Sequence, residues 1–220
     1  MTQNMDPVLK LWGRATSYNV QKVAWIIAEL GLPCSRIDAG GAFGGLDGPE
    51  YIALNPNKRV PTLIDGQQVL WESNAICRYL VDSYAVPPNL KCLTALDRAQ
   101  ADMWMEWFQN NLYTNSIAIF YQTVRLPPSQ RSVEKRDALL YALASAFEIF
   151  DARLKDHKFI LGDQLTLGDI PTGAFLFRYF TMDIERPSLP YLERYYNDLK
   201  QRPAYQDAVM VDYSSLRGLD

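Results

Sequence analysis

The chain has 220 residues, of which 48% are hydrophobic and 21% charged, an ordinary balance for one or two folded domains. A formal net charge of -3 gives no basic field that would gather nucleic acid. Cys34, Cys77 and Cys92 are odd in number and form no paired spacing, and no apolar run reaches the length of a membrane span. These features disfavour a disulfide framework, a zinc site and a membrane protein.

The first third of the chain is predicted to be a small α/β unit. Short apolar runs bounded by turn residues predict four strands, at residues 8–12, 34–38, 62–64 and 68–71. Helical spacing of apolar residues predicts two helices and one helical turn, at residues 20–30, 74–84 and 51–54. Asp65-Gly66 predicts a hairpin between the last two strands. Residues 39–49 are glycine-rich and predict a loop without phosphate-binding spacing.

Residues 55–66 have the features of a clamp for an extended peptide. Pro61 fixes its own φ and has no N–H, and it pushes Val60 toward an extended conformation. The sequence leaves open whether this bond is cis; a cis bond would hold the Val60 N–H and C=O out for a ligand. Ser73 is a good N-cap for the helix that follows, and a helix N-terminus attracts carboxylates. The segment therefore suits a peptide that carries an acid group.

The rest of the chain is predicted to be helical. Val86-Pro87-Pro88-Asn89 predicts a linker, and no strand pattern follows it. Helices are expected at residues 94–124, 132–157, 189–201 and 203–211, with one more opening at a capping box. That box is formed by Thr166 and Asp169, and we interpret it as structural. We therefore predict a first domain at residues 1–85, a linker at 86–93 and a helical domain at 94–220.

Two motifs in this arrangement resemble the cytosolic glutathione S-transferases. The first is Asn55-Pro56-(x3)-Val60-Pro61-x-Leu63, followed in register by Glu72-Ser73. The second is the segment 165–170, Leu-Thr-Leu-Gly-Asp-Ile, about a hundred residues later. The resemblance implies an α/β plus all-α fold, with a thioredoxin-like N-terminal domain followed by an all-helical C-terminal domain.

The same resemblance implies glutathione as co-substrate, without a metal, and assigns a role to each clamp residue. Ser73 would take the γ-glutamyl carboxylate, with Glu72 near the ammonium group. Val60, beside Pro61, would pair with the cysteinyl backbone, and Lys58 or Arg59 would meet the glycyl carboxylate. Some bacterial members also use a glutamine in the loop after the second strand. This chain has Ala42 there, so the loop is expected to bind the glycyl end differently or the affinity to be modest.

The family places the group that stabilises the glutathione thiolate at the start of the first helix. Counting back from Lys22-Val23, which resembles the pattern of serine-type members, places Ser17 at the catalytic position. Asn19 falls where the bacterial threonine/asparagine type has its asparagine, so the chain resembles a bacterial-type member with a serine/asparagine loop. A hydroxyl or amide donor there favours the thiolate. Thr16 and Arg14 are outside candidates, and Ser17 and Asn19 would also serve as simple helix caps.

The implied reaction is conjugation of glutathione to a small hydrophobic electrophile. Tyr18, Trp107 and Tyr113 are predicted to line the electrophile pocket, although most aromatic residues of the helical domain should be packing. Isomerase, dehalogenase and peroxidase or disulfide reductase activities remain alternatives, as does a catalytically silent binding or regulatory protein. A cytoplasmic homodimer is expected, with no nucleic-acid or membrane partner.

Overall fold

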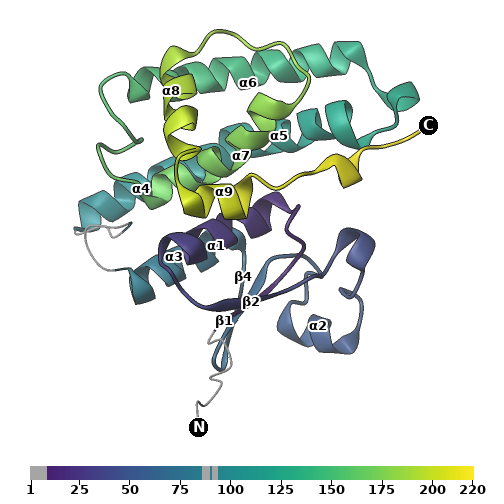
Figure 1. The fold of residues 1–220 in the computed structure, drawn as a ribbon, viewed down its shortest axis with the longest axis vertical. Helices are drawn as coiled ribbons and strands as arrows, with labels where there is room; N and C mark the ends of the chain where they lie inside the picture. The colour runs from purple at the N-terminus through teal and green to yellow at the C-terminus, as the bar shows by residue number, and fades with distance from the viewer. Residues whose placement is uncertain (1–8, 86–89, 91–93) are drawn as a thin grey trace. The chain divides into compact units, whose positions relative to one another are not determined.

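The computed structural model describes residues 9–85, residue 90 and residues 94–220 (Figure 1). The chain divides into two compact units. The first contains Met1–Ala85 and Pro203–Val211, and the second contains Val86–Arg202 and Asp212–Asp220. The predicted linker at 86–93 lies outside the described residues except for Leu90. The sequence predicted a helix at 203–211 but placed it in the helical domain, whereas it belongs to the first unit.

A four-stranded mixed sheet forms the base of the first unit. Its strands are β1 (Leu9–Trp12), β2 (Cys34–Ile37), β3 (Thr62–Asp65) and β4 (Gln68–Trp71), in the order β2-β1-β3-β4. β1 runs parallel to β2 and antiparallel to β3, and β3 and β4 form the predicted hairpin. The parallel pair requires a crossover, which the first helix supplies. The predicted α/β arrangement is confirmed.

The helices of the first unit are α1 (Tyr18–Glu29), α2 (Pro49–Leu54), α3 (Ser73–Tyr84) and α9 (Pro203–Val209). Figure 1 shows α1 beside α3 and α9, with α2 lying away from them. Trp25 of α1 is fully buried, and its ring meets the ring of Tyr205 edge to face at 4.9 Å. The Gln21 side chain also donates to the Val209 carbonyl at 3.4 Å. These contacts explain why α9 belongs to the first unit although it lies near the C-terminal end of the sequence.

The second unit is helical, as predicted, and contains α4 (Ala95–Trp107), α5 (Tyr113–Phe120), α6 (Val133–Leu154), α7 (Ile170–Thr181) and α8 (Pro190–Leu199). The helix expected at 94–124 is instead α4 and α5, each followed by a π-helical turn. Its core is rich in aromatic rings, such as Phe150, which packs against Trp104, Trp107 and Tyr195. Within the described residues, none of the helices has both the length and the apolar character that crossing a membrane requires.

Candidate glutathione site

Ser17 stands at the N-terminus of α1 with its side chain not used for capping. Its backbone is extended (φ -86, ψ 122), and its carbonyl accepts the first helical hydrogen bond, from the Gln21 N–H at 2.9 Å. The hydroxyl makes no cap hydrogen bond, although serine is a favoured capping residue. The residue is 9% exposed. The simple capping interpretation of Ser17 therefore does not account for its hydroxyl.

Asn19 lies in the first turn of α1 and contacts the start of α3. The Ser73 hydroxyl donates to the Asn19 side-chain oxygen at 3.2 Å, across 54 positions of sequence. The structure thus brings together one residue predicted to act on the thiol and one predicted to hold the γ-glutamyl carboxylate. Because the Asn19 oxygen accepts from Ser73, the amide nitrogen is the part of this side chain that can donate to a ligand.

The turn into α3 is strained at Glu72. Glu72 has φ 69 and ψ 108, a conformation that residues with a side chain rarely adopt and that costs on the order of 1–3 kcal/mol. Its carbonyl accepts from the Ile76 N–H at 2.9 Å, so Glu72 is the N-cap of α3, whereas Ser73, which the sequence predicted as the cap, is the first helical residue. The strained turn leaves Glu72 exposed beside the buried Ser73. Strain of this kind gathers at ligand sites, and here it falls at the residues predicted to bind the γ-glutamyl end.

The Val60–Pro61 bond, which the sequence left open, is cis. Two side chains hold the turn before it: the Tyr51 hydroxyl and the Asn55 amide both donate to the Arg59 carbonyl, at 2.6 and 2.9 Å. Among the described residues, the Val60 N–H and C=O make no hydrogen bond. The backbone of Val60 is therefore available to an extended ligand. The sequence analysis did not identify Tyr51 as part of the clamp. Its position four residues before Asn55 could have indicated that both side chains lie on the same side of α2.

Lys58 and Arg59 are exposed. The Lys58 ammonium lies 3.2 Å from the carboxylate of Asp47, in an ion pair whose side chains are 48% and 88% exposed. An exposed pair of this kind contributes at most about 1 kcal/mol, so Lys58 is not fixed there. Its role and that of Arg59 stay predictions.

Lys22 is a buried cation next to the start of α3. It is 1% exposed, its ammonium donates to the Asn74 side-chain oxygen at 2.8 Å, and it lies 5.1 Å from the centre of the Tyr18 ring. Burial raises the pKa of the nearby Cys77 thiol to about 12, although the positive charges of Lys22 and Arg78 lower it. Cys77 is therefore a protonated packing residue at neutral pH.

The three residues predicted to form the electrophile pocket are divided between the units. Tyr18 is buried in the first unit. In the second, Trp107 is half-buried and stacks on Phe150 at 6.0 Å, and Tyr113 is half-buried at the start of α5. Trp107 thus has a packing role of its own, and a shared pocket stays a prediction.

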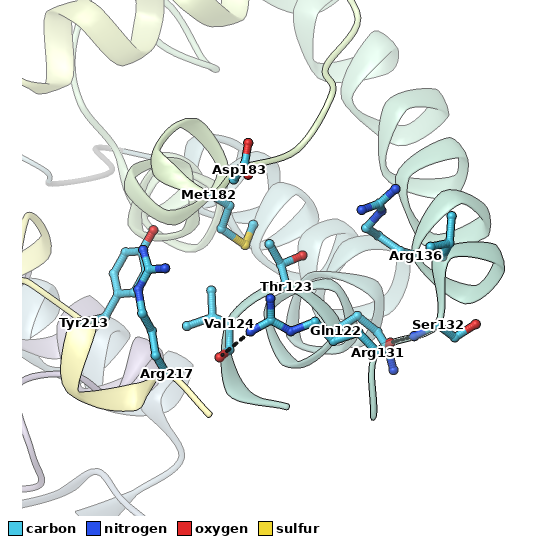
Figure 2. Close-up of a pocket in the computed structure, with 11 residues that line it drawn as sticks. Gln122, Thr123, Val124, Arg131, Ser132, Arg136, Met182, Asp183, Tyr213 and Arg217 are labelled. Carbon is cyan, nitrogen blue, oxygen red and sulfur yellow. Dashed lines mark hydrogen bonds between the residues drawn. The ribbon is translucent and has the colours of Figure 1, made fainter. Parts of the chain in front are cut away.

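A cavity of about 170 Å³ lies within the helical unit (Figure 2). Its walls come from the turn after α5, the start of α6, the end of α7 and the C-terminal residues, including Gln122, Arg136, Met182 and Tyr213. The Tyr213 hydroxyl is hydrogen-bonded to the Thr181 hydroxyl at 2.8 Å, which holds the tail against α7. None of the residues predicted to bind glutathione lines this cavity. In the described part of the chain, His, Cys, Asp and Glu side chains form no group of three suited to a metal ion.

Known proteins match both halves of the chain. The family model "Glutathione S-transferase, N-terminal domain" matches residues 7–82, and "Glutathione S-transferase, C-terminal domain" matches residues 113–203. Glutathione S-transferase GstB of Escherichia coli is 36% identical over 94% of this chain and 100% of its own length. Glutathione S-transferase 3 of Zea mays is 30% identical over 91% of this chain and 93% of its own.

Among solved structures, the theta class glutathione S-transferase of Xanthomonas axonopodis pv. citri with glutathione bound superimposes with a TM-score of 0.90. It is 42% identical in sequence, and the match covers 94% of this chain and 99% of that protein. These findings confirm the family and the fold predicted from the Val60-Pro61 and Glu72-Ser73 motifs. The chain belongs to the glutathione S-transferase family.

Proposed function

We propose that the chain binds glutathione on its first unit, ionises the thiol and transfers the glutathionyl group to a small hydrophobic electrophile. The observation that carries this proposal is the hydrogen bond of 3.2 Å between Ser73 and Asn19. It joins the N-terminus of α3, which suits a carboxylate, to the first turn of α1, where Ser17 stands. One short peptide can then reach the carboxylate site and the thiolate donors together.

Glutathione binds in this proposal as an extended chain. Its γ-glutamyl carboxylate accepts from the Ser73 backbone N–H and from the Ser73 hydroxyl, whose single proton turns from the Asn19 oxygen to the ligand, and its ammonium group lies by Glu72. Its cysteinyl backbone pairs with the N–H and C=O of Val60, in the manner of an added strand. The hydrogen bonds of Tyr51 and Asn55 to the Arg59 carbonyl fix this backbone before the ligand arrives, which lowers the entropy cost of binding.

The chemistry is stabilisation of a thiolate. A free thiol has a pKa of about 8.5 and is mostly protonated at neutral pH. Donation from the Ser17 hydroxyl and the Asn19 amide nitrogen, with the N-terminal dipole of α1, favours the ionised sulfur. The proton leaves to solvent. The thiolate then forms a carbon–sulfur bond with the electrophile, and the leaving group departs with the bonding electron pair.

The family relationship favours conjugation over the other glutathione-dependent reactions, and a substrate panel separates them. Activity with aryl or alkyl halides indicates conjugation or dehalogenation, whereas activity only with peroxides or mixed disulfides indicates a reductase. Isomerase activity consumes no glutathione. A protein that binds glutathione but turns over none of these substrates would be a binding or regulatory member.

We further propose a cytoplasmic homodimer. Val69 and Trp71 are 40% and 41% exposed on β4, an edge strand of the sheet. Exposed apolar side chains on an edge strand are suited to contact with a second subunit. Cys34 and Cys77 are free thiols, which fits a reducing compartment; Cys92 lies outside the described residues.

The catalytic assignment is tested by replacing each thiolate donor. In Ser17→Ala and Asn19→Ala we expect kcat for conjugation to fall, by about a hundredfold for the main donor, because removing one donor to a developing anion costs about that much. We also expect the ultraviolet thiolate band of bound glutathione to appear at higher pH. Urea unfolding checks that the fold is intact.

Ser145→Ala is the matched control, because Ser145 is exposed on α6. It should leave the rate and the thiolate band unchanged. Wild-type turnover and an unshifted thiolate band in both Ser17→Ala and Asn19→Ala would contradict the assignment.

A further inference from the structure

The side chain of Arg14, from the loop that also contains Ser17, packs against the glycine-rich loop after β2. A Cβ atom at Gly40 would lie 3.1 Å from Arg14 Nη1, and one at Gly41 would lie 3.2 Å from Arg14 Nε. Both glycines have positive φ, +76° and +62°. The two glycines therefore leave a space, the Arg14 seat, in which the guanidinium lies; a side chain at either position would strain the backbone and crowd Arg14.

Backbone hydrogen bonds fix Arg14 between this seat and Ser17. The Arg14 N–H donates to the Ala39 carbonyl at 3.1 Å, and the Arg14 carbonyl accepts from the Ser17 N–H at 3.0 Å. The glycine-rich loop is itself closed by a bond of 2.7 Å from the Gly40 N–H to the Gly44 carbonyl. The arginine is thus part of the rigid frame around the proposed thiolate donor.

Arg14 also borders the proposed peptide clamp. The Cβ position of Gly40 is 3.7 Å from Val60 Cγ1 as well as 3.1 Å from Arg14 Nη1, so both side chains flank the same glycine. Glutathione has a second carboxylate, on its glycyl residue, at the opposite end from the one assigned to Ser73. If the ligand passes Val60 with its γ-glutamyl end at Ser73, a cation near its other end would pair with this second carboxylate.

We propose that Arg14 receives the glycyl carboxylate of glutathione, an inference that rests on the proposed function. A guanidinium is planar and matches a carboxylate with two parallel hydrogen bonds. In this chain it does the work of the loop amide that Ala42 cannot supply. Arg14 is partly buried beside the glycine-rich loop, whereas Lys58 and Arg59 are both exposed.

The test pairs a change in the protein with a change in the ligand. Binding of glutathione is compared with binding of its glycyl monoethyl ester and of γ-glutamylcysteine amide, which both lack a free carboxylate at that end. The wild type should bind glutathione about ten- to a hundredfold more tightly than either analogue, the usual effect of a lost charged hydrogen bond.

In Arg14→Gln this preference should disappear, because the variant cannot distinguish the acid from the ester. Its KM for glutathione should rise by the same factor. Arg14→Lys keeps the charge without the planar fork and should retain part of the preference. If urea unfolding shows that Arg14→Gln is unstable, Arg14→Lys replaces it as the test variant.

Lys58→Gln and Arg59→Gln are the competing variants, since both residues are also candidates for the glycyl carboxylate. The proposal is overturned if Arg14→Gln and Arg14→Lys keep the full wild-type preference, or if the preference is lost in Lys58→Gln or Arg59→Gln instead. Failure of the proposed function looks different: the wild type would bind neither glutathione nor γ-glutamylcysteine amide.

Discussion

Asp169 is fully buried, and its two carboxylate oxygens accept four hydrogen bonds. One oxygen accepts from the Ile160 N–H at 2.9 Å and the Tyr195 hydroxyl at 3.1 Å. The other accepts from the Thr166 N–H at 2.8 Å and the Thr166 hydroxyl at 2.9 Å. Burial raises the pKa of this carboxyl to about 6, and the hydrogen bonds oppose that rise. The structural interpretation of the capping box rests on these contacts.

Replacing Asp169 with alanine should destabilise the fold without acting on the chemistry. The change leaves the buried Ile160 N–H and the part-buried Thr166 N–H without an acceptor, at about 1–3 kcal/mol each, so we expect the free energy of unfolding to fall by at least about 2 kcal/mol. Because the raised pKa makes the folded chain bind the proton more tightly, the stability due to Asp169 is lost as pH rises through about 6. Urea unfolding from about pH 4 to 7 measures both effects.

The difference in unfolding free energy between wild type and Asp169→Ala should therefore be larger at the acidic end of that range. Asp163→Ala is a suitable control, since Asp163 is exposed nearby in the same connection. A difference that grows as pH rises would contradict the expected direction of the effect.

At the scale of elements, α9 completes the core of the first unit. Tyr205 is 0% exposed and packs edge to face on Trp25. In Tyr205→Ala we expect a loss of about 3–5 kcal/mol, the usual cost of deleting a buried aromatic ring. Urea unfolding followed by tryptophan fluorescence measures it. Tyr141→Ala on α6, where the ring is 77% exposed, should change stability by less than about 0.5 kcal/mol. Equal effects of the two variants would mean that α9 adds little.

Most elements were predictable, because local signals specify them. Asp65-Gly66 placed the hairpin between β3 and β4, and the sequence after residue 89 predicted helices, which the described residues 94–220 form without a further named strand. The partner of α9 was not predictable. The sequence of α9 predicts a helix with apolar positions, but it does not indicate that these positions pack against α1.

The same limit applies to the site. The Val60-Pro61 and Glu72-Ser73 motifs were readable from spacing, whereas the bond between Asn19 and Ser73 joins residues 54 positions apart. The position of the Arg14 side chain depends on the positive φ angles of Gly40 and Gly41. The presence of glycines in the sequence does not specify these angles, because glycine adopts many conformations.

At the scale of the whole molecule, the proposed dimer is testable through β4. A charge on an apolar edge strand opposes pairing with a second copy, so Val69→Lys should shift the protein from dimer to monomer in sedimentation velocity. Gln67→Lys adds the same charge in the adjacent hairpin turn and is the control. A wild-type protein that sediments as a monomer would contradict the proposal directly.

The place of α9 in the first unit also has a consequence for how the protein is made. α3 ends at Tyr84, but α9 begins only at Pro203, after the helices of the second unit. At translation rates of about 5–20 residues per second, Trp25 emerges from the ribosome roughly ten to forty seconds before Tyr205. During that interval the α1 face around Trp25 is open to chaperones and to other nascent chains, and the first unit closes only when synthesis is nearly finished.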